Sequence, residues 1–174
     1  MATRGDNVVL IGMPGAGKST VGLALARACG MAFVDTDAII QNRENRPLQE
    51  ILDTEGVLGF RRIEEKHLLA LAPRHTMVST GGSVIFSDRA RDHLRSLGRV
   101  VWIDAPLADI QQRLTNLATR GVVRWPGQTV EVIFRERRPL YQRWSDVRVS
   151  SEGKTEQQTV QDTLKALRAL GLNV

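Results

Sequence analysis

The sequence predicts an α/β fold, a three-layer sandwich in which a five-stranded parallel sheet carries helices on both faces. Two observations and one general rule of strand connection support this expectation. Short apolar segments alternate with longer segments of helical periodicity along the chain. The first apolar segment, residues 8–11, is apolar at every position, which is typical of a strand buried on both faces. Repeated strand–helix–strand units form a parallel sheet, because the crossover connection is right-handed in nearly all proteins.

The predicted strands are short apolar segments bounded by glycine or by polar residues. They span residues 8–11, 32–34, 76–79, 100–103 and 147–149. The predicted helices span residues 18–29, 89–97, 129–144 and 155–170, with a further helical stretch over residues 48–71. Gly56 and Gly59 interrupt that stretch, so we expect two helices within it. Asp104 and Pro106 predict the start of another helix, as a capping residue and a proline in the first turn.

The composition indicates an ordinary globular protein with a basic surface. A length of 174 residues fits one domain, and 42% hydrophobic residues with 25% charged residues argue against disorder as the main state. The formal net charge of +5 favours anionic partners. Aromatic residues make up 5% of the chain, which is few for the stacking surfaces of single-strand and RNA binders. We therefore expect no nucleic-acid partner.

The cysteine content and the first residues bear on localisation. Cys29 is the single cysteine, so no intrachain disulfide can form, as is usual in a reducing compartment. Residues 1–7 are polar, and the apolar run that follows is too short for a secretory core or a membrane span. We expect a cytoplasmic monomer that does not contact membranes.

A phosphate-binding motif lies between the first predicted strand and the first predicted helix. Residues 12–19 read Gly-Met-Pro-Gly-Ala-Gly-Lys-Ser and match the P-loop pattern G-x-x-x-x-G-K-[ST], which predicts a fold of the P-loop NTPase type. The glycines allow backbone N–H groups to face phosphate oxygens, and the helix N-terminus adds partial positive charge. Lys18 should reach the β- and γ-phosphates as a catalytic residue, and Ser19 should bind Mg²⁺. The predicted ATP-binding residues of this loop are Gly15, Ala16, Gly17, Lys18, Ser19 and Thr20.

Two carboxylates follow the second predicted strand. Asp35 and Asp37 should lie near the transferred phosphate, where one can bind the metal or its water and the other an acceptor hydroxyl. The alternative is that one of them only caps a helix. Residues 53–56 match the D-x-x-G pattern of GTPases, but they lie in a helical stretch and the chain has no N-K-x-D guanine motif. The pattern therefore favours a kinase or ATPase over a GTPase.

Five motifs in order resemble the shikimate kinase family. They are the P-loop extended to G-M-P-G-A-G-K-S-T, D-T-D at residues 35–37, F-R-x-x-E at 60–64, T-G-G-S-V at 80–84 and E-R-R-P-L-Y at 136–141. The resemblance covers about residues 8–149. It implies a kinase of the nucleoside monophosphate kinase type that, with Mg²⁺, transfers the γ-phosphate of ATP to the 3-hydroxyl of shikimate in aromatic amino acid biosynthesis. ATP, ADP and shikimate are thus its implied partners.

The resemblance also implies roles for individual residues. Asp37 corresponds to the proposed catalytic base, which binds the reacting diol, and Asp35 lies near the metal. Arg61 and Arg137 hold the shikimate carboxylate, although arginines on a helix are more often part of a solvated charged face. Planar guanidinium groups suit a carboxylate and stay charged at any working pH. Gly81 and Gly82 place backbone against the substrate, and Ser83 stands where the family usually has a third glycine.

The nucleotide side includes a lid. The resemblance implies one kinase domain over residues 1–174, with a lid at about 113–128 and substrate-binding helices at about 37–72. Arg120 is the better match to the catalytic lid arginine that contacts the nucleotide phosphates, and Arg124 is the alternative. Arg113 corresponds to an adenine-stacking arginine and Lys154 to a C-terminal nucleotide contact.

Two other functions remain open at this point. One is a different small-molecule P-loop kinase, such as one that phosphorylates gluconate; the D-T-D and E-R-R-P-L-Y motifs favour shikimate. The other is a non-catalytic nucleotide-binding or nucleic-acid-binding module, suggested by the sequence pI of about 10.1. The intact Lys18, Ser19 and Asp37 argue against a protein that has lost catalysis.

Overall fold

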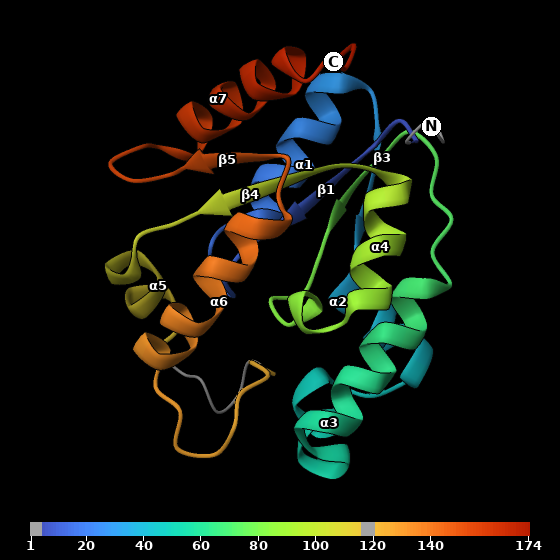
Figure 1. The fold of residues 1–174 in the computed structure, drawn as a ribbon, viewed down its shortest axis with the longest axis vertical. Helices are drawn as coiled ribbons and strands as arrows, with labels where there is room; N and C mark the ends of the chain where they lie inside the picture. The colour runs from blue at the N-terminus through green and yellow to red at the C-terminus, as the bar shows by residue number, and fades with distance from the viewer. Residues whose placement is uncertain (1–4, 116–120) are drawn as a thin grey trace.

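The computed structural model describes residues 5–115 and 121–174 and contains a five-stranded sheet with helices on both faces (Figure 1). The strands are β1 Asn7–Ile11, β2 Ala32–Asp35, β3 Thr76–Ser79, β4 Gly98–Asp104 and β5 Val147–Ser150. They lie in the order β2-β3-β1-β4-β5, and every neighbouring pair is parallel. The predicted α/β fold is therefore confirmed.

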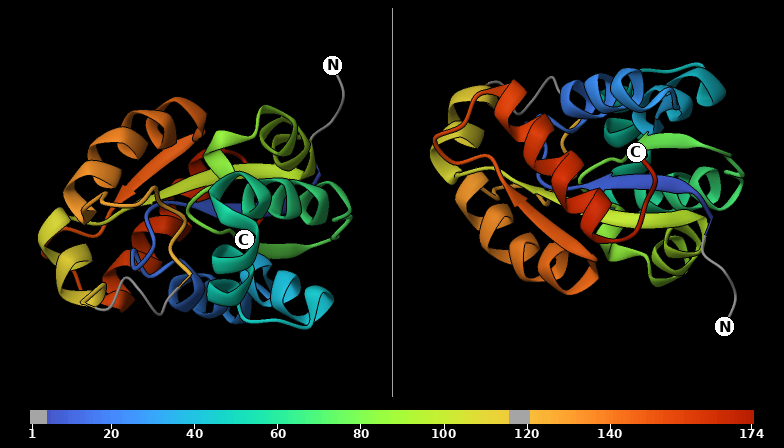
Figure 2. Two further views of the ribbon diagram at one scale, coloured as in Figure 1. Left: turned by 90° about the horizontal axis from the view of Figure 1, so that it is seen from below. Right: turned by 90° about the horizontal axis from the view of Figure 1, so that it is seen from above.

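Helices cover both faces of the sheet. Helices α1 and α7 lie on one face, and α4 and α6 lie on the other (Figure 2). The bounds are α1 Lys18–Cys29, α2 Thr36–Glu44, α3 Leu48–Leu69, α4 Asp88–Leu97, α5 Leu107–Arg113, α6 Val130–Trp144 and α7 Glu156–Ala169, with a 3-10 helix η1 at Val84–Phe86. Within residues 5–115 and 121–174, no helix is both long enough and apolar enough to cross a bilayer.

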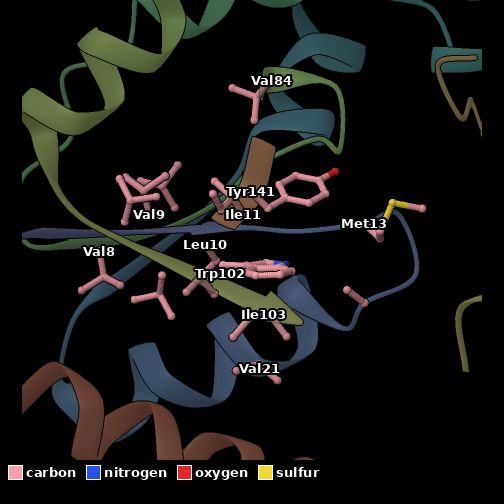
Figure 3. Packing of buried hydrophobic residues seen from close by; sticks show 14 of the residues in the cluster. Val8, Val9, Leu10, Ile11, Met13, Val21, Val84, Trp102, Ile103 and Tyr141 are labelled. Atoms are coloured by element: carbon pink, nitrogen blue, oxygen red, sulfur yellow. The ribbon is translucent and has the colours of Figure 1, made fainter. Parts of the chain in front are cut away.

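The main core is built around the central strand β1, whose residues are all buried. Figure 3 shows its side chains packing to both sides, with Val9 and Ile11 towards Tyr141 and with Val8 and Leu10 towards the α1 side of the sheet. Trp102 of β4 stacks on Tyr141 of α6 at a ring-centroid distance of 6.2 Å. This packing fixes the carboxyl end of β1, from which the P-loop continues.

Three local features differ from the sequence prediction or refine it. Asp104 does not begin a helix: it ends β4, and α5 begins at Leu107 with Pro106 at its capping position. The reason is that the buried Asp104 carboxylate forms ion pairs with Arg138 and Arg148, which hold it at the strand end. Helix α2 lies within the range 37–72 that the resemblance gives to the substrate-binding helices, but the periodicity did not indicate it as a separate helix. The break in α3 lies at Gly56 alone, where φ is +68° and ψ is −179°.

A second, smaller apolar cluster joins the substrate-side helices to the chain after residue 120. Its buried members are Ile40, Ile51, Val57, Phe60 and Val123, and they come from α2, α3 and the segment before α6. Gly121 approaches so closely that a Cβ there would lie 2.6 Å from the Cβ of Leu48. The segment 121–123 is therefore packed against α3 in this structure.

Candidate active site

The loops after β1, β2 and β3 open on one cleft of about 710 Å³ at the carboxyl edge of the sheet. Ligands bind at this edge in open parallel sheets. Most of the predicted site residues line the cleft, namely Gly15, Ala16, Gly17, Lys18, Ser19, Thr20, Asp37, Gly81, Gly82, Arg113, Arg137 and Lys154. Asp35 and Arg61 lie immediately behind the cleft wall, as their contacts below indicate. Arg120 lies outside the described residues.

The P-loop has the backbone geometry that its glycines suggest. Gly15 and Gly17 have φ values of +78° and +88°, which other residues rarely adopt, and Gly17 caps α1. The Lys18 ammonium donates hydrogen bonds to the carbonyl oxygens of Gly12 at 3.0 Å and Met13 at 2.8 Å. Burial lowers the pKa of Lys18 to about 8, against the opposing effect of the Asp37 and Asp35 carboxylates. This ammonium is held over the loop, where a phosphate group would meet it.

Asp35 combines a capping role with a contact to the P-loop. Its Oδ1 accepts hydrogen bonds from the backbone N–H groups of Asp37, at 2.9 Å, and Ala38, so Asp35 is the N-cap of α2. Its Oδ2 accepts a hydrogen bond of 2.6 Å from the Ser19 hydroxyl, which also lies 3.1 Å from the Ser79 hydroxyl. Asp35 therefore caps α2, and the same carboxylate also adjoins the predicted Mg²⁺ ligand Ser19.

Asp37 and Glu64 face the same point above Gly81. A Cβ on Gly81 would lie 2.7 Å from Asp37 Oδ1 and 2.7 Å from Glu64 Oε1, so only glycine leaves room for both carboxyl groups. Burial and the neighbouring Asp35 carboxylate raise the pKa of Asp37 to about 6, while Lys18 acts in the opposite direction. Burial also raises the pKa of Glu64 to about 7. Two carboxyl groups with raised pKa values on one cleft wall are typical of a catalytic site.

Two guanidinium groups converge beside these carboxyl groups. Arg137 is 1% exposed, and its Cζ lies 5.5 Å from the ring centroid of Phe86. The Cζ of Arg61 lies 3.9 Å from the same centroid. One Arg137 nitrogen donates a hydrogen bond to the carbonyl oxygen of Val123. The Nε and Nη1 atoms of Arg137, and Nε of Arg61, are buried without a hydrogen-bond partner among the described residues. Buried cationic donors of this kind favour an anionic ligand.

Gly82 is held tightly between the P-loop and α6. A Cβ on Gly82 would lie 2.6 Å from Cδ of Pro14 and 3.2 Å from an Arg137 nitrogen. The buried Tyr141 hydroxyl donates a 2.6 Å hydrogen bond to the Gly82 carbonyl oxygen. A side chain at position 82 would therefore collide with Pro14, so this packing requires glycine, and the contact of Gly82 with the acceptor stays a prediction.

The remaining nucleotide-side residues lie at the outer end of the cleft. Arg113 donates a 3.0 Å hydrogen bond to the Gly15 carbonyl oxygen, which places its guanidinium beside the P-loop. Lys154 also lines the cleft, but its ammonium pairs with Asp162 at 2.9 Å and donates to the Ser150 carbonyl oxygen. Arg124, the alternative lid arginine, donates to the Gln128 carbonyl oxygen within its own turn. Of the predicted lid at 113–128, residues 116–120 are not described.

Three residues of the site had no role assigned from the sequence. Glu64 is the last residue of the F-R-x-x-E motif and lies three positions after Arg61, a helical spacing that places both on one face. Tyr141 ends the E-R-R-P-L-Y motif in the same way. Ser83 was noted only as a departure from a glycine, yet its φ of −98° is ordinary for serine, and its hydroxyl donates a 2.6 Å hydrogen bond to Glu64. The final positions of the motifs were the available signal for Glu64 and Tyr141.

A P-loop joined to a second half-site of carboxylates and arginines defines a class of protein, the small-molecule kinases of the P-loop type. In proteins of this class, one half of the cleft binds the nucleotide phosphates and the other binds the acceptor.

Comparison with known proteins gives the family within this class. A family model described as shikimate kinase matches residues 14–168. A shikimate kinase of Sulfurihydrogenibium sp. (strain YO3AOP1) is 32% identical over 163 residues, or 93% of this chain and 98% of the relative. The structure of a shikimate kinase from Acinetobacter baumannii in complex with shikimate has a TM-score of 0.86 at 26% identity, covering 99% of this chain and 97% of that one.

The chain therefore belongs to the shikimate kinase family and is an ATP-dependent small-molecule kinase. A gluconokinase from Sinorhizobium meliloti 1021 has a TM-score of 0.55 at 20% identity, with coverage of 97% of this chain and 95% of that one, and shares the fold alone.

Proposed function

We propose that this cleft transfers the γ-phosphate of ATP to the 3-hydroxyl of shikimate, giving shikimate 3-phosphate and ADP. One observation carries the assignment of the acceptor: the guanidinium groups of Arg61 and Arg137 both lie against the ring of Phe86, and Arg137 lines the same cleft as Asp37. Burial and the positive charge of Arg137 lower the pKa of Arg61, and a carboxylate bound between the two groups would offset the repulsion. The acceptor therefore carries both a carboxylate and a hydroxyl, as shikimate does.

Arg137 and Arg61 would bind the acceptor carboxylate through nitrogens that find no partner among the described residues. A planar guanidinium can offer two parallel N–H donors to a carboxylate. Backbone at Gly81 and Gly82, which line the cleft, would lie against the ring of the acceptor. These contacts would orient the hydroxyl towards the P-loop before reaction, which lowers the entropic cost of reaching the transition state.

Asp37 would accept the proton of the reacting hydroxyl. Its pKa of about 6 leaves it mostly ionised at neutral pH yet more basic than an ordinary aspartate. The acceptor oxygen forms a bond to the γ-phosphorus, the bond from that phosphorus to the bridging oxygen breaks, and ADP leaves. Lys18 and Arg120 would stabilise the negative charge that develops on the phosphate oxygens.

Ser19 and Asp35 would hold Mg²⁺. The hydroxyl and carboxylate oxygens of these residues lie 2.6 Å apart beside the P-loop, and oxygen ligands of this type suit a hard cation that keeps several of its waters. Described residues provide no cluster of three acidic, histidine or cysteine side chains, which agrees with a metal held mainly by phosphates and water. Bound Mg²⁺ would neutralise charge on the β- and γ-phosphates.

The nucleotide base would lie towards Arg113 and Lys154, at the outer end of the cleft. The segment at about 113–128 would form the lid, and the helices at about 37–72 would bind the acceptor, all within one kinase domain. We further propose that the protein is a cytoplasmic monomer, supported by the lack of any intrachain disulfide in a chain with one cysteine.

The test is a coupled assay of ADP release from Mg·ATP by the purified protein, with shikimate, 3-deoxyshikimate and gluconate as acceptors. We expect release with shikimate, and only background release with 3-deoxyshikimate, which keeps the carboxylate but lacks the reacting oxygen. Equal or faster release with gluconate would contradict the assignment of the acceptor. Omission of Mg²⁺ should also abolish ADP release. The assignment requires that ADP release depend both on shikimate and on Mg²⁺.

A further inference from the structure

Ser83 forms a buried link between the loop after β3 and helix α3. It is 3% exposed, and its hydroxyl donates a 2.6 Å hydrogen bond to Oε2 of Glu64, which is also 3% exposed. A glycine at this position could not make this bond. The link therefore depends on the Ser83 side chain.

Glu64 uses only one of its oxygens in this link. Oε2 is taken by Ser83, whereas Oε1 is buried and has no hydrogen-bond partner among the described residues. Oε1 lies beside Gly81, opposite Asp37 Oδ1, and Glu64 lines the cleft. A buried acceptor without a donor is unfavourable, so a hydroxyl of the ligand or its water would complete it.

The charges around Glu64 act in both directions. Burial and the Asp37 carboxylate on α2 favour its neutral form, whereas the Ser83 hydroxyl, Arg137 on α6 and Arg61 on α3 favour its ionised form. The buried phenol of Tyr141 on α6 is the other titratable group that interacts with it. The result is a carboxyl group with a pKa of about 7, whose ionised form loses stabilisation when the Ser83 donor is removed.

We propose that Ser83 is a positioning residue of the acceptor site, which turns the carboxyl group of Glu64 so that Oε1 faces the acceptor beside Asp37 and Gly81. This inference rests on the proposed function, since it concerns the same acceptor. Ser83 itself touches neither the phosphates nor the reacting oxygen. It acts by fixing the rotamer of Glu64 and by favouring its ionised form, in which both oxygens are acceptors.

The structure offers a closely matched control. The Ser87 hydroxyl donates a 2.6 Å hydrogen bond to Oε2 of Glu65, the neighbour of Glu64 on the same helix, but neither Ser87 nor Glu65 lines the cleft. Ser87 also caps α4 by accepting from the Ala90 N–H group. Ser87→Ala therefore removes an equivalent bond, and some stability, without touching the acceptor site.

The test compares Ser83→Ala, Ser83→Gly and Ser87→Ala in steady-state kinetics from pH 6 to pH 9. We expect both Ser83 variants to raise the KM for shikimate about fivefold to tenfold, the effect of losing one ordinary hydrogen bond, because Ser83 does not itself touch the acceptor; the KM for ATP should be unchanged. The acidic limb of kcat/KM for shikimate should move to higher pH by about half a unit to one unit, because the pKa of Glu64 rises when a donor to its ionised form is removed. Ser87→Ala should change neither quantity.

A second comparison separates positioning from a loss of folding. Ser83→Ala in a Glu64→Ala background should have no further effect on the KM for shikimate, since the carboxyl group through which Ser83 acts is absent. A KM and an acidic limb unchanged in Ser83→Ala, or changes of equal size in Ser87→Ala, would overturn the role of Ser83. Absence of shikimate turnover by the unmodified protein would instead overturn the proposed function, so the two failures are distinguishable.

Discussion

The two halves of the cleft are built in different ways. The nucleotide half consists largely of consecutive residues, 12–20, whose backbone conformation is fixed by glycines and by the start of α1. The acceptor half is assembled from side chains of separate elements: Asp37 of α2, Glu64 of α3, Ser83 of the loop after β3 and Arg137 of α6. The first half depends on local sequence, and the second depends on how four elements pack.

This difference determines where each half is sensitive to change. Phosphates would be held by a loop whose shape is set over a few consecutive residues, with glycines at positive φ and the Lys18 ammonium bonded to the carbonyl oxygens of Gly12 and Met13. The acceptor groups hold one another through hydrogen bonds such as Ser83 to Glu64 and Tyr141 to Gly82. Substitutions in the nucleotide half should therefore affect turnover, and those in the acceptor half should affect shikimate binding.

The largest expected effect is that of Lys18→Ala in the nucleotide half. Its ammonium is buried over the P-loop and would interact most strongly as charge develops on the transferring phosphate. We expect kcat to fall on the order of 100-fold or more, with a smaller change in the KM for shikimate. Steady-state ADP release measures this, with Lys165→Ala on the exposed face of α7 as the control. Turnover within a few-fold of the unmodified protein would show that the motif does not act in catalysis.

The next effect separates the two candidate lid arginines. Arg120→Ala should lower kcat about tenfold to 100-fold, because a charge-assisted contact to the phosphates is lost. Arg124→Ala should lower it only weakly, since this guanidinium binds the Gln128 carbonyl oxygen within its own turn. The same ADP-release assay at saturating substrates ranks them. The reverse order would mean that residues 124–126, and not 120–122, correspond to the lid motif of the family.

A smaller effect is expected in the acceptor half, from Arg137→Lys. The change keeps the positive charge but replaces a planar fork with a single ammonium. The KM for shikimate should rise about tenfold, the value of one charge-assisted hydrogen bond, while the KM for ATP stays within a few-fold. Arg135→Lys is the control, because Arg135 lies on the exposed face of the same helix. A rise confined to the KM for ATP would contradict this prediction and assign Arg137 to the nucleotide half of the cleft.

How much of the structure could be predicted follows the same division. The strands, most helices and the P-loop were predictable, because apolar runs, helical spacing and a contiguous motif are local signals. The periodicity did not indicate helix α2, because this helix has too few apolar residues to show a helical repeat. Asp104 was misread as a helix cap because its ion-pair partners Arg138 and Arg148 are distant in sequence. The hydrogen bond from Ser83 to Glu64 spans 19 residues and two elements, so no local pattern contains it.

The smallest expected effect is a change in tryptophan fluorescence, and it concerns residues 121–128. Trp125 is 45% exposed, and its backbone N–H donates to the side chain of Gln128, whereas Trp102 and Trp144 are 2% and 4% exposed in the core. An exposed indole changes its emission when a loop closes over substrates, as lids of such enzymes do. We expect Mg·ADP with shikimate to change the intrinsic fluorescence, and Trp125→Phe to remove most of that change while kcat stays within about twofold, as is usual for an exposed position. Trp144→Phe should retain the change. A fluorescence change that persists in Trp125→Phe would mean that the environment of residues 121–128 does not change when both ligands bind. Another segment would then have to close over the cleft.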